Sequence, residues 1–230
     1  MMLSIQSPPR ANQHGFTLLE MAVVMVILGL LLGGLLGPLA SQRESKNLNT
    51  VNQQLLEIHD ALLGYAAVNG FLPCPSRANS SGLEARNGAG RCQQEHGFVP
   101  IRTLGLQGPV DSNTRLLDPW LVPIRYSLTS VGTWEYARGV QLNGSASNYR
   151  VCGQSVCSEV LADNVVAVIF SLGENGNLTT TSVDELENTD GDDTFVSRVK
   201  SEASGSEFND TLRWLSPNIL MHQLVKAGRL

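Results

Sequence analysis

One carboxylate, Glu20, stands directly before the longest apolar stretch of the chain, where its chemistry needs an explanation. The twenty residues that follow it, MAVVMVILGLLLGGLLGPLA, contain no charged or amide side chain. A helix of that length extends about 30 Å, which is the hydrocarbon thickness of a bilayer. We therefore expect a membrane-spanning helix over residues 16–40, in which Glu20 costs a few kcal/mol unless a partner compensates its charge.

Two alternatives stand beside this interpretation. A secretory signal has a shorter apolar stretch, of about 7 to 15 residues, followed by a small residue at the cleavage site, a place that Ala40 could take. Glu20 could also be an ordinary flanking charge at the headgroup boundary.

The residues before the apolar stretch form a recognisable motif. A polar leader, MMLSIQSPPRANQHG, is followed by Phe16-Thr17-Leu18-Leu19-Glu20. This pattern resembles the type IV pilins and the pseudopilins of type II secretion. The resemblance implies that a prepilin peptidase cuts after Gly15 and methylates Phe16, and that Glu20 serves filament assembly. It also implies a bacterial inner-membrane protein with one span and a periplasmic C-terminal domain, whose partners are the peptidase, other pilin-like subunits, an inner-membrane assembly platform and membrane lipid.

Three glycines lie within the apolar stretch at intervals of four residues. Gly29, Gly33 and Gly37 therefore share one helix face, where bare backbone permits close helix packing. The alternative is that glycine is simply frequent in spanning helices.

An amphipathic pattern continues beyond the apolar stretch. Apolar residues from Leu48 to Leu62 recur at steps of three and four, so we predict one helix over Thr17–Asn69, ended by Gly70. The resemblance identifies residues 41–70 as a periplasmic stalk. The chain then divides into a leader (1–15), the membrane half of the helix (16–40), the stalk (41–70) and a globular domain (71–230).

The globular domain is predicted to be an antiparallel sheet with long loops and a short C-terminal helix over Pro217–Ala227, which gives the chain an α+β fold. Runs of β-branched and aromatic residues between turn residues indicate the strands. These are Ile124–Leu128, Thr133–Leu142, Tyr149–Cys152, Val165–Leu172 in the centre, Thr194–Val199 and Thr211–Leu215.

A short motif before the first of these strands carries a second resemblance. Asp118-Pro119-Trp120 is similar to the strand entry of pseudopilins. Leu121 departs from that pattern, because the usual residue there is glycine.

Four cysteines, all beyond the apolar stretch, are typical of a domain in an oxidising compartment. Three pairings are open, of which we favour the sequence-local one, Cys74–Cys92 and Cys152–Cys157. A zinc site from Cys74, Cys92, His96 and one further cysteine is the alternative, although its spacing matches no common zinc module.

An acidic run lies between Arg150 and Arg198, which hold nine carboxylates and no Lys or Arg between them. Major pseudopilins are similar in carrying calcium on a late loop, so the candidate ligands are Glu187, Asp190, Asp192 and Asp193. The EF-hand pattern fails at Leu186. A solvated acidic loop without metal is the alternative.

Composition limits the function further. The net charge of −5 and the pI of about 5.4 leave no basic footprint for nucleic acid. Nucleophile-elbow, P-loop and dinucleotide motifs do not occur, so we expect no enzyme activity and no cofactor apart from the candidate calcium. The expected function is a structural pseudopilin or minor pilin. The alternative is a single-span, membrane-anchored periplasmic binding domain that does not polymerise.

Overall fold

The structure is a computed structural model that describes residues 15, 17–129, 147–178 and 182–229, without the side chains of residues 32 and 34–40. The chain divides into two compact units, Met1–Lys46 and Asn47–Leu230. The predicted strand over Thr133–Leu142 lies outside the described residues.

A single helix, α1, runs over Leu18–Asn69, as the hydrophobic periodicity predicts. It ends at Gly70, whose positive φ of 80° is readily adopted only by glycine, and whose N–H donates to the carbonyl of Ala66 at 2.7 Å. No basic residue lies in the last turn of α1. Instead Arg229, from the C-terminal end of the chain, donates to the carbonyl oxygens of Ala67 and Val68. The guanidinium thus supplies the cation that a helix C-terminus favours.

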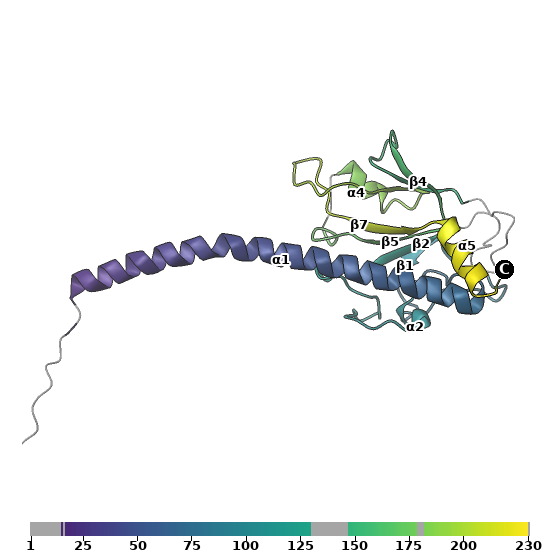
Figure 1. Cartoon of the computed structure of the whole chain (residues 1–230), viewed down its shortest axis with the longest axis horizontal. Coiled ribbons are helices and arrows are strands. Elements are labelled where there is room, and N and C mark those ends of the chain that lie inside the picture. Colours follow the sequence, from purple (N-terminus) through teal and green to yellow (C-terminus); the bar gives the residue numbers. More distant parts are fainter. Residues whose placement is uncertain (1–14, 16, 130–146, 179–181, 230) are drawn as a thin grey trace, which may run out of the picture. The chain divides into compact units, whose positions relative to one another are not determined.

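Among the described residues, the globular unit contains two sheets, whereas the sequence predicted one antiparallel sheet (Figure 1). A four-stranded antiparallel sheet has the order β1 (His96–Phe98), β2 (Arg125–Leu128), β5 (Ala167–Ser171), β7 (Thr211–Leu215). A three-stranded sheet has the order β4 (Val160–Val165), β3 (Tyr149–Cys152), β6 (Thr194–Val196). In the second sheet β3 and β6 are parallel, so the prediction of a wholly antiparallel meander is wrong.

The predicted central strand, Val165–Leu172, is divided between the two sheets. Its first residue ends β4, and Ala167–Ser171 form β5, which lies between β2 and β7 with all five residues buried. A continuous apolar run cannot show where one strand ends and the next begins, since Val165 at the end of β4 is buried like the residues of β5.

The layers of the globular unit follow from the alternation of side chains along β5. Ile169 faces a core that it shares with Leu55 and Ile58 of α1, whereas Phe170 faces the second sheet, where its ring lies 5.8 Å from that of Phe195. The four-stranded sheet therefore lies between the Asn47–Asn69 part of α1 and the three-stranded sheet.

The C-terminal helix α5, Pro217–Lys226, agrees with its sequence signals. Ser216 Oγ accepts the N–H of Ile219 at 3.3 Å, and proline occupies the first helical position. Leu220 and Leu224 are buried in the core beside α1. Two short helices, α2 (Ile101–Leu104) and α4 (Val183–Glu187), were not predicted.

The Asp118 motif forms a tight turn before β2. The buried carboxylate accepts the N–H of Trp120 at 2.9 Å and of Val122 at 2.8 Å, and the hydroxyl of Ser171 at 2.5 Å. This turn sets Leu121 in the left-handed region, with φ of 65°. The position where glycine is usual thus requires a conformation that disfavours a leucine side chain.

Candidate functional site

The expected processing site lies at the start of the described chain. Gly15 is exposed, and a Cβ added to it would meet no atom within 4 Å. Phe16, the expected mature N-terminus, lies outside the described residues.

Thr17 and Glu20 cap the N-terminus of α1 reciprocally. The Thr17 carbonyl accepts the first helical hydrogen bond, from Met21 N–H at 3.2 Å, and its Oγ1 accepts Glu20 N–H at 3.2 Å. Glu20 Oε2 in turn accepts Thr17 N–H at 2.9 Å and Thr17 Oγ1–H at 3.1 Å. This is a capping box, which satisfies donors that the helix itself leaves free.

The capping box was missed in the sequence, although the pattern Thr-x-x-Glu before an apolar run is its signature. Only Oε2 of Glu20 is used in these bonds. Among the described residues, none donates a hydrogen bond to Oε1. One carboxylate can therefore cap its own helix and still present an oxygen to a second molecule.

The apolar side chains after Glu20 are exposed on every side of the helix. They include Met21, Val24, Ile27 and Leu31, which are spaced by three or four residues, and also the residues between them. Among the residues that the structure describes, no helix is long and apolar enough to be identified as a membrane span. The membrane-crossing part of the prediction for residues 16–40 stays a prediction.

The glycines expected to pack against other helices lie on α1. A Cβ added at Gly29 or Gly33 would meet nothing within 4 Å, so this face is open. The surroundings of Gly37 are not described.

The four cysteines form two disulfides, Cys74–Cys92 and Cys152–Cys157, the sequence-local pairing. The zinc alternative is therefore wrong, because the sulfur atoms of Cys74 and Cys92 are bonded to each other. His96 instead stacks on the ring of Tyr149 at 5.7 Å, with Nδ1 3.0 Å from Ser127 Oγ, and burial lowers its pKa.

The candidate calcium ligands come together in part. Oxygen atoms of Glu187, Asp190 and Asp192 lie within 4.8 Å of one another. Asp193 is not in this group; its Oδ2 accepts a hydrogen bond from the amide of Asn148. Burial, then the charges of Asp192 and Asp190, raise the pKa of Glu187. Three carboxylates, two of them exposed, form only part of a calcium shell of six to eight oxygens.

A cavity of about 250 Å³ lies beside α4. Its lining includes Arg125, Leu172, Glu185 and Asp210. Asp210 accepts a hydrogen bond from Asn188 at 2.7 Å, yet burial raises its pKa to about 7. No pattern in the sequence marks this group, since its burial depends on tertiary packing.

The comparisons with known proteins bear on the N-terminus. Residues 10–36 match the family described as the prokaryotic N-terminal methylation motif. This motif is the signature of type IV pilins and pseudopilins, and the chain carries it with Gly15, Phe16 and Glu20 inside the matched segment. No curated protein and no solved structure matches the chain.

Proposed function

We propose that this chain is a structural subunit of a periplasmic filament, either a pseudopilin or a minor pilin, and not an enzyme. A prepilin peptidase cuts between Gly15 and Phe16, and the mature subunit joins other pilin-like subunits at an inner-membrane assembly platform. The observation that carries this proposal is the methylation motif at residues 10–36. The long N-terminal helix and the α+β globular unit are consistent with it.

The exposed apolar half of α1 supports a membrane location before assembly. Each apolar CH₂ group left in water costs about 0.8 kcal/mol, so a helix that exposes apolar side chains on all sides needs a cover. We propose that lipid provides this cover in the inner membrane, and that neighbouring helices provide it in the filament. The sequence supports the lipid stage, since twenty residues after Glu20 carry no charge.

The geometry of Glu20 supports a role in assembly that is separate from capping. Oε2 is used by Thr17 within the same chain. We propose that Oε1 accepts the charged amine of a neighbouring subunit's Phe16 after cleavage. Leaving one partner of such a pair without its counter-charge in an apolar surrounding costs roughly 3 to 5 kcal/mol.

The test compares Glu20→Gln with Glu20→Ala in the full chain, in cells that contain the whole assembly machinery. Glutamine retains the capping-box bonds but removes the charge, whereas alanine removes both. The readout is disulfide crosslinking between subunits through single cysteines introduced along Met21–Leu36. We expect both variants to lose crosslinking at least about a hundredfold, because the pair energy of several kcal/mol is lost in each.

Intact-mass measurement provides the control. Both variants should lose fifteen residues and gain one methyl group like the wild type, since neither change removes Gly15 or Phe16. Wild-type crosslinking in the glutamine variant would show that Glu20 only caps its helix. An absence of crosslinking in the wild type itself would favour the membrane-anchored binding domain and overturn the filament proposal.

A further inference from the structure

The guanidinium of Arg125, at the start of β2, donates no hydrogen bond to any residue that the structure describes. It lies 4.6 Å from the ring centroid of Phe98, against which the guanidinium of Arg115 also packs, at 4.8 Å. Arg115 is paired with Asp111, whereas no described carboxylate lies within ion-pair distance of Arg125. Burial, then the charge of Arg115, lower the pKa of Arg125. A ring face attracts a cation but leaves the N–H donors of a guanidinium without acceptors.

Arg125 lines the cavity of about 250 Å³ beside α4. This cavity lies at the end of the four-stranded sheet where β2 and β7 begin and β5 ends, because its lining includes Arg125, Asp210 and Leu172. Leu178 and Leu186 add apolar side chains to its wall. Since a cavity of about 150 Å³ holds a molecule of the size of benzene, this one has room for roughly ten non-hydrogen atoms.

Asp210 lines the same cavity and has one carboxyl oxygen without a donor among the described residues. The residue is only 8% exposed, and its Oδ2 accepts the amide of Asn188 at 2.7 Å. The same amide nitrogen also donates to the carbonyl of Val196 at 3.1 Å, so Asn188 has no N–H left for Oδ1. A buried carboxylate oxygen without a donor is costly until a proton or a cation binds. Burial accordingly raises the pKa of Asp210 to about 7.

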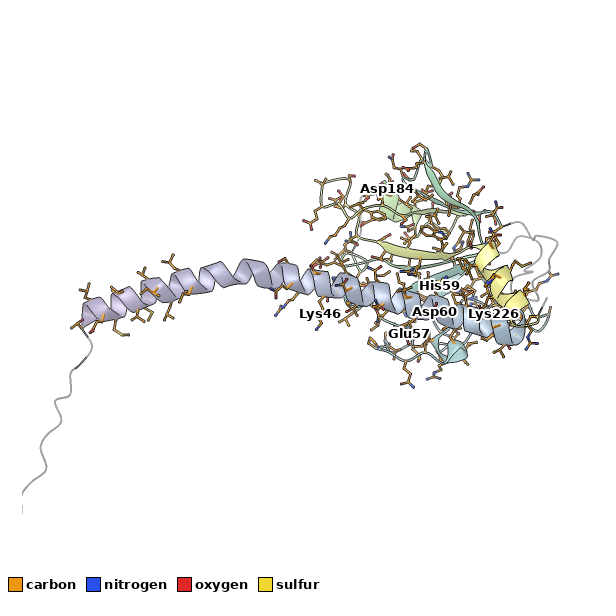
Figure 2. The ribbon with its side chains drawn as sticks, viewed as in Figure 1. Lys46, Glu57, His59, Asp60, Asp184 and Lys226 are labelled. Carbon is orange, nitrogen blue, oxygen red and sulfur yellow. A yellow bond between two sulfur atoms is a disulfide. The ribbon has the colours of Figure 1, made fainter. Side chains whose placement is uncertain are left out.

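The α4 side of the cavity is held in place by hydrogen bonds and an ion pair. Glu185, which also lines the cavity, accepts the N–H of Asn209 through Oε1 and the amide of Asn175 through Oε2, both at 2.9 Å. Asp184, which Figure 2 labels beside the ribbon of α4, lies 2.7 Å from Nε of Arg198. These contacts tie α4 to the segment after β5, the segment after β6 and the segment before β7, so the cavity is formed without a ligand.

We propose that this cavity binds a compact zwitterion, whose carboxylate pairs with Arg125 and whose ammonium group pairs with Asp210. A carboxylate accepts two parallel N–H bonds from a guanidinium, and an ammonium group supplies the donor that Oδ1 of Asp210 lacks. A simple anion would meet the carboxyl groups of Asp210 and Glu185, and a simple cation would meet the guanidinium. The ligand class is therefore a small amino acid or amino-acid derivative. This site goes beyond the filament function proposed above and does not depend on it.

The test is isothermal titration calorimetry of the full-length protein in detergent with three amino acids. Glycine, 4-aminobutanoate and 6-aminohexanoate carry the same two charged groups at increasing separation. Butanoate and butylamine, which carry one charged group each, are the matched controls. We expect at least one amino acid to bind with a Kd below about 1 mM, at least tenfold more tightly than either control.

Substitutions in the same assay test the two assigned residues. In Arg125→Gln the best amino acid should bind no more tightly than butylamine, and in Asp210→Asn no more tightly than butanoate, because each change removes the partner of one ligand charge. These comparisons are made within one variant, so they do not depend on its stability. Arg102→Gln and Asp163→Asn change exposed residues outside the cavity and should keep the wild-type affinities.

Three outcomes would overturn the zwitterion site. The first is that none of the three amino acids gives a saturable heat with the wild type. The second is that butanoate or butylamine binds as tightly as the best amino acid, which would assign the cavity to a simple anion or a simple cation. The third is that the amino acid keeps its advantage over both controls in Arg125→Gln and in Asp210→Asn.

Discussion

Replacing Leu121 with glycine should stabilise the globular unit, although it removes a large apolar side chain. Leu121 has φ of 65° and is 67% exposed, and the turn is fixed by its N–H bond to the Asp118 carbonyl at 3.0 Å. A left-handed conformation costs an ordinary residue about 1 to 2 kcal/mol, and glycine loses roughly 0.5 to 1 kcal/mol more chain entropy on folding. The difference is a gain of about 0.5 to 1 kcal/mol. For a unit of this size it corresponds to a rise in Tm of about 1 to 4 °C.

The assay is chemical unfolding of the full-length protein in detergent, followed by tryptophan fluorescence, for which Trp120 is adjacent to the turn. Leu178→Gly is the matched control, because Leu178 is 73% exposed but has no positive φ. That variant should lose stability by about 0.5 to 1 kcal/mol through glycine entropy alone. A loss of the same size in Leu121→Gly would refute the strain at this turn.

Two further predictions concern pH and redox state. Burial raises the pKa of Asp210 from 3.8 to about 7, so the folded state binds this proton more tightly than the unfolded state does. The free energy of unfolding should therefore fall as pH rises from about 4 to 7, by on the order of 2 to 4 kcal/mol. Asp210→Asn should reduce this loss when unfolding is measured between pH 4 and 8. The loop closed by Cys74–Cys92 has a sequence separation of 18 against 5 for Cys152–Cys157. Serine replacement of the first pair should therefore cost about 3 kcal/mol and of the second about 2 kcal/mol, and equal losses in the same assay would contradict the loop-length dependence.

The helices α1 and α5 and several strands were predictable because their signals are local. The steps of three and four from Leu48 to Leu62 describe a helix face, and Gly70 ends it in the structure as in the pattern. Tyr149–Cys152 and Thr211–Leu215 agree residue for residue with the observed strands. The second sheet was not predictable, because the parallel pairing of β3 with β6 joins residues more than forty positions apart. β4 combines apolar residues with Asp163 and Asn164 and is mostly exposed, so it lacks the alternation of a half-buried strand.

The N-terminal site was the part of the chain that the sequence predicted most directly, since the residues of its motif are contiguous. The same sequence motif also predicts the capping box, because Thr17 and Glu20 have the spacing that such a box requires. The left-handed turn at Leu121 could not be found from conformational propensity, because a positive φ is favoured by glycine and disfavoured by leucine. It follows from the three bonds that Asp118 accepts, and these involve Ser171, which is 53 residues away.

The carboxylates of the acidic run between Arg150 and Arg198 differ in ways that the sequence does not indicate. Its nine carboxylates look equivalent in the sequence, but they differ in the structure. Asp184 is paired with Arg198, and Glu185 accepts hydrogen bonds from Asn175 and from the N–H of Asn209. Asp190 and Asp192, by contrast, are exposed. The difference depends on tertiary packing, because the partners of Asp184 and Glu185 lie in other segments of the chain.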